Sequence, residues 1–551
     1  MTAPTLPPAD ARSSYRIGPS VPALPDETVG ANLSRIAAAY PDRDALVECA
    51  SGRRWTYAQF DVAVSELARG LLAAGIGVGD RVGIWSPNCA EWVLLQYAAA
   101  KAGAILVNLN PSYREHEIRY TLQQSGTRLL VAATQVKTSD YQEMIEHVRA
   151  DCPQLQQVVH IGTQSWDNLV AGGAAVSAAD LAAREAGLRP DDPMDIQYTS
   201  GTTGFPRGAT LSHRNVLGNG YMVAETQGWT EQDRVCLPVP LYHCFGMVMG
   251  NLGATSHGSC MVLPGLLFDP ADALRAVQQE RCTALYGVPT MFIAELARME
   301  QNPGEFDLSS LRTGVMAGSP CPVEVMKRVI AEMGMTDVTI CYGMTETSPV
   351  STQTRMDDPV QRRVATVGRA HPHVEVKVVA PETGETLPVG TPGELCTRGY
   401  SVMLGYWNDP ERTAEAIDGE GWMHTGDLAE MDEDGYVSIV GRIKDMVIRG
   451  GENVYPREVE EFLYTHPDIE DVQVIGVPDP KYGEELMAWV RLRPGAAELT
   501  GEQMRAYCTG QLAHYKIPRY LHLVDGFPMT VTGKVRKVEM REQARAILGL
   551  E

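Results

Sequence analysis

The sequence predicts an α/β protein with two parts. One is a large N-terminal domain of mostly parallel sheets flanked by helices, including a small β-barrel-like part, and the other is a small mobile α+β C-terminal domain. The chain has 551 residues, enough for several domains at about 100 to 200 residues each. Hydrophobic residues make up 44% and charged residues 21%, which is typical of folded globular proteins and excludes a disordered chain. The order of strand and helix patterns supplies the rest of the prediction.

Strand patterns alternate with helix patterns before about residue 370. One helical pattern begins at Pro87, carries apolar residues at helical spacing on one face, and ends at Gly103. Another begins at Pro289. Because parallel strands are joined by crossovers that are usually helices, this alternation predicts largely parallel sheets. The strand-like runs beside these helices are residues 81–86, 104–109, 128–132, 283–287 and 338–342.

The last third of the chain has a different pattern of secondary structure. Short β-rich runs broken by Gly and Pro follow residue 370, and a compact segment follows residue 445. We therefore predict a domain boundary near residues 441–445, with an N-terminal domain at 1–441 and a C-terminal domain at 447–551. The expected strands in this third are 374–379, 393–398, 435–440 and 472–477, and the expected helices are 456–466 and 501–512.

The net charge and the spacing of the cysteines argue against several classes of function. Asp and Glu total 69 against 47 Lys and Arg, a net charge of −22 that argues against nucleic-acid binding and against an anionic membrane surface. No apolar run of roughly 18 residues offers a stable membrane anchor. The 11 Cys show no CxxC pair and the 12 His no HExxH motif, which predicts reduced thiols in the cytoplasm and no zinc site. A homodimer is compatible with the sequence.

Residues 198–208 read YTSGTTGFPRG and follow a strand-like run. Hydroxyl and glycine residues give a turn with many donors for an anionic phosphate, although an ordinary surface loop can have the same composition. The run does not fit the Walker motif, since Pro206 occupies the place of the second Gly, and it does not fit GxGxxG either.

This run, followed by LSHRN, resembles the phosphate-binding signature of the adenylate-forming superfamily. That superfamily includes acyl-CoA synthetases, adenylation domains of peptide synthetases, and luciferases. Further matches follow in the family's order and span nearly the whole chain: PLYH, AGSP, YGMTET, GWMHTGD, GRIKDMVIRGGENVYPREVE and TGKVRK. The general texture is most similar to that of medium-chain fatty acyl-CoA synthetases.

The resemblance implies a reaction in two steps that uses ATP, Mg²⁺ and coenzyme A. A carboxylate attacks ATP to give acyl-AMP and pyrophosphate, and the coenzyme A thiol then displaces AMP. The alternatives within the superfamily are an aryl-acid CoA ligase, a stand-alone amino-acid adenylation enzyme that loads a carrier protein, and a luciferase-like oxygenase. A phosphohydrolase or nucleotide switch would also use a phosphate loop but would not need the C-terminal lysine of TGKVRK.

Three side chains have a chemistry that suits such a reaction. Glu346 offers carboxylate oxygens to Mg²⁺, Asp427 has two oxygens for the two ribose hydroxyls, and Lys534 could stabilise the charge that develops on ATP. A solvated loop glutamate, a turn aspartate and a basic helix end are the ordinary alternatives. His243 could equally be a core histidine or an acyl-site residue.

The family positions complete the expected site. The catalytic set is Lys534, His243, Glu346 and Thr345, with Glu346 as the metal ligand. ATP and AMP contacts are expected from Thr199, Ser200, Gly201, Thr202, Thr203, Gly204, Arg207, Gly318, Ser319, Tyr342, Gly343, Thr345, Asp427, Ile439 and Arg442. The acyl group is expected to contact His243, Phe245, Gly246, Tyr286, Val288 and Gly343. Gly450 and Gly451 are expected to bind coenzyme A. The resemblance also implies that residues 442–446 form a hinge centred on Lys444, about which a mobile C-terminal domain at 447–551 rotates.

Two positions depart from the family pattern, and one acidic residue lies near the expected acyl site. Arg207 stands where the family commonly has Lys, and Ile448 stands where many relatives have a second C-terminal Lys, unless Arg449 supplies that contact. Around the expected acyl site, only Glu295 could carry charge, so the ammonium of an amino acid would lack an acidic partner. The sequence therefore favours an uncharged aliphatic acid, and the family resemblance implies one of medium length.

Overall fold

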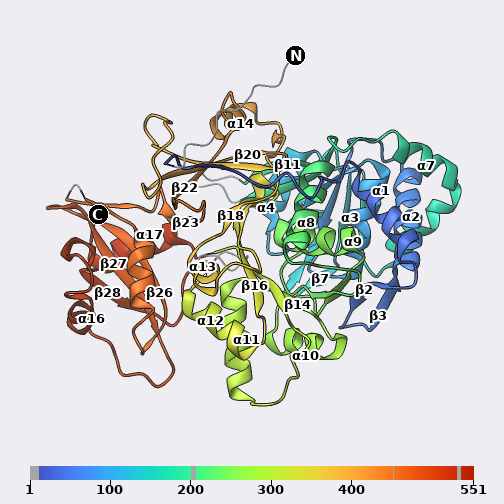
Figure 1. Ribbon diagram of the computed structural model, residues 1–551. Helices are drawn as coiled ribbons and strands as arrows, with labels where there is room; N and C mark the ends of the chain where they lie inside the picture. The colour runs from blue at the N-terminus through green and yellow to red at the C-terminus, as the bar shows by residue number, and fades with distance from the viewer. Residues whose placement is uncertain (1–11, 200–205, 320, 451, 530–534, 551) are drawn as a thin grey trace. The chain divides into compact units, whose positions relative to one another are not determined.

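The computed structural model describes residues 12–550 except 200–205, 320, 451 and 530–534 (Figure 1). Its packing divides the chain into two compact units. The larger unit consists of Arg16–Val376 and Thr397–Met423, and the smaller unit of Met1–Tyr15, Lys377–Cys396 and His424–Glu551. The smaller unit therefore takes in segments on the N-terminal side of residue 441, and the predicted domain limits stay a prediction.

The first sheet of the larger unit has seven strands in the order β21-β11-β10-β5-β4-β6-β9. Its centre is parallel, and β10 and β11 form an antiparallel pair. The strands are β4 (Arg81–Trp85), β5 (Ile105–Asn108), β6 (Leu129–Ala132), β9 (Gln157–His160), β10 (Pro193–Thr199), β11 (Arg207–Ser212) and β21 (Gly405–Tyr406).

The second sheet has nine strands in the order β18-β17-β16-β15-β14-β12-β13-β2-β3. The run from β16 to β2 is parallel, and the outer strands pair antiparallel. The strands are β2 (Asp44–Glu48), β3 (Arg53–Thr56), β12 (Arg234–Cys236), β13 (Cys260–Leu263), β14 (Ala284–Gly287), β15 (Thr313–Met316), β16 (Asp337–Gly343), β17 (Val350–Gln353) and β18 (Arg369–Ala370).

Helices flank both sheets, which confirms the predicted fold class (Figure 1). The helix predicted from Pro87 is α3, and it begins three residues later, at Ala90, and ends at Gly103 in the left-handed region, with φ of 74°. Its apolar residues were expected on one face, but all 13 residues are buried because α1 and α2 also pack on it. The main helices are α1 (Val29–Ala39), α2 (Tyr57–Ala73), α3 (Ala90–Ala102), α4 (Glu115–Ser125), α5 (Tyr141–Arg149), α8 (His213–Thr226), α10 (Pro270–Glu280), α11 (Pro289–Gln301) and α12 (Val323–Glu332).

The β-rich run after residue 370 forms a five-stranded sheet in the order β1-β19-β20-β22-β23. Two of the predicted strands, at 374–379 and 393–398, appear as β19 and β20. The strand predicted at 435–440 begins only at Val437, because residues 433 and 434 form a turn and the chain is not yet extended into the sheet at 435 and 436. The strands are β1 (Tyr15–Ile17), β19 (Val374–Val379), β20 (Gly393–Gly399), β22 (Met423–Met431) and β23 (Val437–Arg442).

The C-terminal segment folds around its own sheet, β25-β24-β27-β26 with β28 paired to β27. The helix predicted at 501–512 ends at Cys508, because Thr509 is extended and Gly510 has φ of 79°. The elements are β24 (Val447–Arg449), β25 (Glu452–Val454), β26 (Ile469–Asp479), β27 (Gly483–Leu492), β28 (Tyr520–Leu523), α15 (Pro456–Leu463), α16 (Gly501–Cys508) and α17 (Lys537–Leu548).

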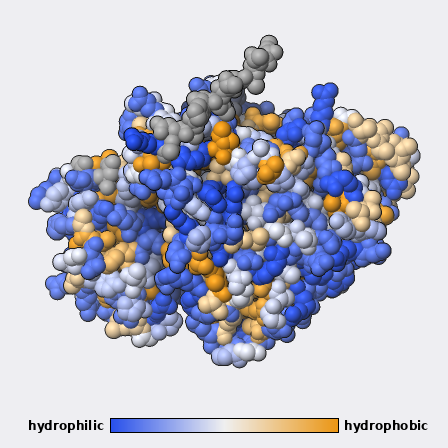
Figure 2. Space-filling model, viewed as in Figure 1, coloured by the Kyte–Doolittle hydropathy of each residue, from blue (hydrophilic) through white to orange (hydrophobic). Residues whose placement is uncertain are grey.

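The surface is mostly hydrophilic on the face shown in Figure 2. Hydrophobic residues form smaller patches between the hydrophilic ones. Among the described residues, no helix has both the length and the apolar character that crossing a membrane requires.

Candidate active site

Strand β10 carries the first residue of the predicted phosphate loop. Thr199 ends β10 and pairs with Arg207 at the start of β11, so the loop joins two hydrogen-bonded strands. Ser200, Gly201, Thr202, Thr203 and Gly204 lie outside the described residues. The guanidinium carbon of Arg207 lies 5.5 Å from the centre of the Tyr406 ring. Arg207 is therefore held on an aromatic face at the base of the loop.

Glu346 lies where the two sheets of the larger unit meet. It belongs to the short helix η3 (Thr345–Thr347), which follows β16, and it is only 5% exposed. The Tyr406 hydroxyl donates to its Oε1 at 2.8 Å, and the Thr199 hydroxyl lies 3.4 Å from the same oxygen. Thr345, its neighbour, is half-buried. The structure thus brings Glu346 to the end of the strand that carries the phosphate loop.

Tyr406 is a site residue that the sequence reasoning missed. It is on β21, which pairs with β11 so that Tyr406 faces Ala209. Burial and the nearby Glu346 carboxylate raise the pKa of the Tyr406 hydroxyl, which keeps it a hydrogen-bond donor at neutral pH. No local motif could reveal this contact, because Tyr406 and Glu346 are 60 residues apart.

Several other predicted residues follow the carboxyl ends of β14, β15 and β16. These three strands are parallel neighbours, so their ends lie along one sheet edge, which is where open α/β sheets place ligands. Gly318 has φ of 92°, which favours glycine. Gly343 cannot carry a side chain, since a Cβ would lie 1.7 Å from the carbonyl oxygen of Pro349. The predicted residues at this edge are Val288, Gly318, Ser319, Tyr342, Gly343 and Thr345.

The predicted acyl residues are partly brought together. Phe245 begins the π-helix η2 (Phe245–Leu252), and its ring centre lies 5.5 Å from that of Tyr286 on β14. His243 is half-buried, and its ring stacks obliquely on that of Tyr242, with 4.3 Å between ring centres. Gly246 approaches the backbone of Pro240, where a Cβ would lie 2.4 Å from the carbonyl oxygen. π-Helices are rare and occur mostly at functional sites.

A buried polar side chain on β10 supports the backbone of this segment, and no motif in the sequence predicted it. The Oε1 of Gln197 on β10 accepts from the backbone N–H of Cys244 at 3.1 Å. Beside it, Asn108 donates to Asp195 at 3.0 Å, and burial raises the pKa of Asp195 well above its usual value. The strand that leads to the phosphate loop therefore also fixes the backbone next to His243.

Burial disfavours the charged form of Glu295. It is 1% exposed on α11, and neither of its carboxyl oxygens has a hydrogen-bond partner among the described residues. Burial raises its pKa well above the ordinary value. A neutral carboxyl offers no counter-ion to an ammonium group, which removes the one acidic candidate near the expected acyl site.

The smaller unit holds a second set of predicted residues. Asp427 on β22 pairs in register with Arg442 on β23, and the Arg442 Nε donates to Asp427 Oδ1 at 3.1 Å. The Arg442 side chain is 62% exposed and that of Asp427 only 15%. Ile439 is half-buried and pairs with Ala429. The two residues expected at the ribose are thus cross-strand neighbours.

The segment after β23 contains the expected hinge and the coenzyme A glycine. Lys444 is exposed in the turn between β23 and β24. Gly450 has φ of 62° and donates its N–H to the carbonyl of Tyr482 at 2.8 Å. Ile448 is 49% exposed, whereas Arg449 is buried in an ion pair with Glu485. Arg449 is thus engaged within the smaller unit, and Gly451 and Lys534 lie outside the described residues.

The comparisons with known proteins agree with this arrangement. Residues 33–407 match the family model of the AMP-binding enzymes, and residues 458–534 match that of their C-terminal domain. The chain is 48% identical to a putative acyl-CoA synthetase, YngI, of Bacillus subtilis over 542 residues, which cover 95% of this chain and 98% of the relative. It is 44% identical to the mitochondrial medium-chain acyl-CoA ligase ACSF2 of Danio rerio, with 98% and 92% covered. The anthranilate CoA ligase AuaEII, solved with anthranoyl-AMP, superposes with a TM-score of 0.85 at 28% identity, with 96% and 99% covered.

Proposed function

Because this chain belongs to the AMP-binding enzyme family and is an acyl-CoA synthetase of that family, we propose that it joins medium-chain fatty acids to coenzyme A. The observation that carries the proposal is the Glu346 site, where a buried carboxylate, two hydroxyls and the stem of a phosphate loop meet. The substrates are small molecules, namely a carboxylic acid, ATP and coenzyme A.

A carboxylate does not react with a thiol at neutral pH, because its carbonyl is electron-rich and oxide is a poor leaving group. In the proposed first step, a carboxylate oxygen attacks the α-phosphorus of ATP, the bond to the β-phosphate breaks, and pyrophosphate leaves. Arg207 and Lys534 would meet the negative charge of the phosphates, and Asp427 would hold the ribose. In the second step, the coenzyme A sulfur attacks the acyl carbon and loses its thiol proton to solvent, the bond from that carbon to the phosphate oxygen breaks, and AMP leaves.

Glu346 fits a magnesium ion by its chemistry. The buried Glu346 carboxylate is joined by the hydroxyls of Thr199 and Tyr406, an all-oxygen set of the kind that Mg²⁺ prefers. We propose that Glu346 holds the ion through its carboxylate. Bound there with ATP, Mg²⁺ would neutralise part of the phosphate charge.

The second step needs a different set of residues from the C-terminal segment at the reacting groups. We propose that Lys444 is the hinge about which residues 447–551 rotate, so that Lys534 serves the first step and Gly450 and Gly451 serve the second. The exposed turn at Lys444 supports this role, because a turn can absorb a change of backbone angles without repacking a core. The positive φ of Gly450 supports a backbone that coenzyme A can approach closely.

Two observations favour an aliphatic acid over an amino acid. Most buried residues near Phe245 and Tyr286 are apolar, and the burial of Glu295 disfavours its charged form. The relative from Danio rerio is named a medium-chain acyl-CoA ligase. An aryl acid remains the second candidate, because AuaEII is an anthranilate CoA ligase.

A substrate panel and one variant test the function. Pyrophosphate release and acyl-CoA formation should rise about three- to four-fold in kcat/KM per added methylene, from butyrate to an optimum at roughly eight to ten carbons. Benzoate and anthranilate represent the aryl alternative. Equal rates at all chain lengths, or a preference for acetate or an amino acid, would contradict the substrate class.

Lys534→Ala should lower acyl-AMP formation by at least about 10²-fold, because it removes the positive charge that stabilises the reacting phosphate. Thioester formation from supplied acyl-AMP should stay near the wild-type rate. Equal losses in both steps would contradict the role of Lys534 while leaving the family reaction in place. Lys537→Ala is the neighbouring control, since Lys537 is engaged with Glu460 at 2.6 Å.

We propose a cytoplasmic location from the state of the cysteines. All 11 are without a disulfide, and ten of them are buried, which suits a reducing environment such as the cytoplasm.

A further inference from the structure

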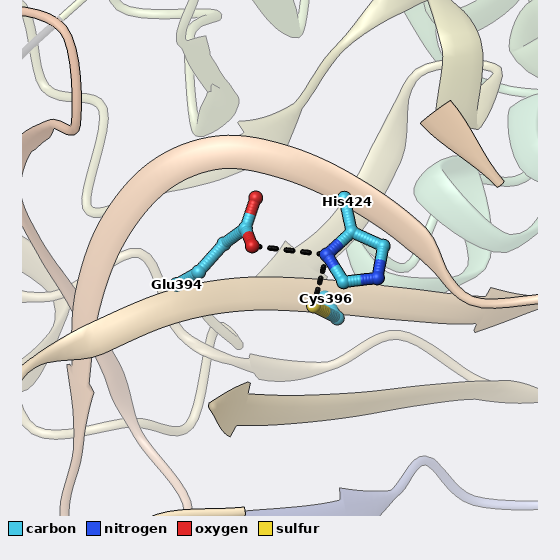
Figure 3. A group of neighbouring side chains, drawn as sticks. All are labelled: Glu394, Cys396 and His424. Atoms are coloured by element: carbon cyan, nitrogen blue, oxygen red, sulfur yellow. Dashed lines mark hydrogen bonds and ion pairs between the residues drawn. The ribbon is translucent and has the colours of Figure 1, made fainter. Parts of the chain in front are cut away.

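Three side chains with different metal-binding atoms converge in the smaller unit, and none of them is assigned above to ATP, acyl or coenzyme A. They are Glu394, Cys396 and His424 (Figure 3). The Nδ1 of His424 lies 2.9 Å from Oε2 of Glu394 and 3.5 Å from Sγ of Cys396. All three ligand atoms lie within 4.8 Å of one another. A carboxylate oxygen, an imidazole nitrogen and a sulfur therefore face one point.

The strand geometry explains why they converge. Glu394 and Cys396 are two residues apart on β20, and side chains at that spacing lie on the same face of a strand. His424 is near the start of β22, the neighbour of β20 in the sheet. Two positions on one strand and a third on the adjacent strand present three ligands from one face of a sheet.

We propose that Glu394, Cys396 and His424 form a binding site for a divalent transition-metal ion of the Zn²⁺ class. Tetrahedral zinc, at about 2.0 Å from nitrogen and 2.3 Å from sulfur, places these two atoms about 3.5 Å apart, as here. The nitrogen and oxygen would have to separate from 2.9 Å to about 3.4 Å, which a small side-chain rotation provides. Three protein ligands leave a fourth position for water or another ligand.

The burial of the three side chains favours a rigid metal site that a metal ion can reach from solvent. Cys396 is fully buried and Glu394 is 9% exposed, whereas the His424 side chain is 32% exposed. The backbone N–H of Gly426 donates to Oε1 of Glu394 at 3.0 Å, which leaves Oε2 turned toward His424. Such a supporting contact orients a metal-binding carboxylate.

Binding would exchange protons for the metal in a balanced way. The thiol of Cys396 loses its proton to solvent and its sulfur lone pair bonds the metal. In the metal-free protein, the Nδ1–H of His424 donates to the ionised Glu394. On binding, that proton leaves Nδ1 and the neutral ring carries its one proton on Nε2 by exchange with solvent, so that the Nδ1 lone pair and a Glu394 oxygen both bond the metal. No oxidant or reductant is needed.

The experiment uses the untagged full-length protein, stripped of metal with a chelator and titrated with Co²⁺ and then Zn²⁺. We expect one equivalent of Co²⁺ to bind with a thiolate-to-cobalt charge-transfer absorption in the near ultraviolet, and Zn²⁺ to displace it. Cys396→Ser should abolish the absorption, and His424→Asn should weaken binding by about 10²-fold or more. Cys49→Ser and His147→Asn are the matched controls and should bind like the wild type.

Circular dichroism and Tm establish whether each variant is folded. If Cys396→Ser does not fold, Glu394→Gln and His424→Asn decide the question, because both leave the buried sulfur in place. The proposal is overturned if the wild type shows no charge-transfer absorption. It is equally overturned if Cys49→Ser removes the absorption or if folded cluster variants bind cobalt as the wild type does.

Discussion

The Glu346 region and the Asp427 region are built in opposite ways. Glu346 is buried and contacts Thr199 and Tyr406, which are 147 and 60 residues away in the sequence. Asp427 pairs with Arg442 only 15 residues away, across one strand pair, and the Arg442 side chain is mostly exposed. The first region depends on the assembly of two sheets, and the second on a local hairpin. The same substitution should therefore cost both stability and activity in the first region, but mainly activity in the second.

Truncation of Glu346 should have the largest effect. Glu346→Ala removes the proposed metal ligand and leaves the Tyr406 hydroxyl without its buried acceptor. Acyl-AMP formation should fall by at least about 10²-fold, and the unfolding free energy by about 1–3 kcal/mol. Pyrophosphate release and denaturant unfolding measure the two effects. Glu382→Ala, on an exposed loop, is the control and should change neither.

Truncation of Asp427 is the matched test in the other region. Asp427→Ala should lower kcat/KM for ATP by about 10-fold or more, because it removes a charged acceptor of the ribose hydroxyls. Its unfolding free energy should stay within about 0.5 kcal/mol of the wild type, since its ion-pair partner is exposed to solvent. A stability loss as large as that of Glu346→Ala would break the contrast between the two regions.

The loss of one hydroxyl should have a smaller effect. Tyr406→Phe keeps the ring beside Arg207 but removes the hydrogen bond to Glu346, which is worth about 1 kcal/mol. We expect about a five-fold higher Mg²⁺ requirement, with kcat recovered at saturating Mg²⁺. A fall in kcat that added Mg²⁺ does not restore would mean that Tyr406 does not act through Glu346.

The smallest effect on activity is expected at Glu295. Its folded-state pKa is raised, so its neutral form is compatible with the fold and stability declines as the pH rises above the ordinary value of about 4.5. Glu295→Gln stays neutral at every pH. Its gain in Tm over the wild type should therefore be near zero at pH 4.5 and grow toward pH 8, with acyl-CoA formation changed less than about two-fold. An equal Tm difference at both pH values would contradict a buried, protonated Glu295.

The sequence predicted features that depend on local order. The alternation of strands and helices indicated the parallel sheets, and the motifs indicated Glu346, Asp427 and Arg442, which the structure places at a sheet edge and on a strand pair. It could not indicate Tyr406 or Gln197, whose contacts arise from strand pairing over long separations. The Glu394, Cys396 and His424 cluster also forms through strand pairing, so a search for HExxH and CxxC motifs could not find it. The predicted end of α16 was wrong. The helix ends at Cys508, Thr509 is its C-cap, and Gly510 follows with a left-handed backbone.

The π-helix that begins at Phe245 also sets how this wall of the expected acyl site can be altered. A π-helix holds more residues per turn than an α-helix, because its hydrogen bonds join residues five apart rather than four. A substitution within Phe245–Leu252 changes one side chain and leaves the winding as it is. Deleting a single residue would rewind the segment and rotate every later side chain to a new direction. Insertions and deletions should thus reshape this wall of the expected acyl site in a way that point mutation of the segment does not.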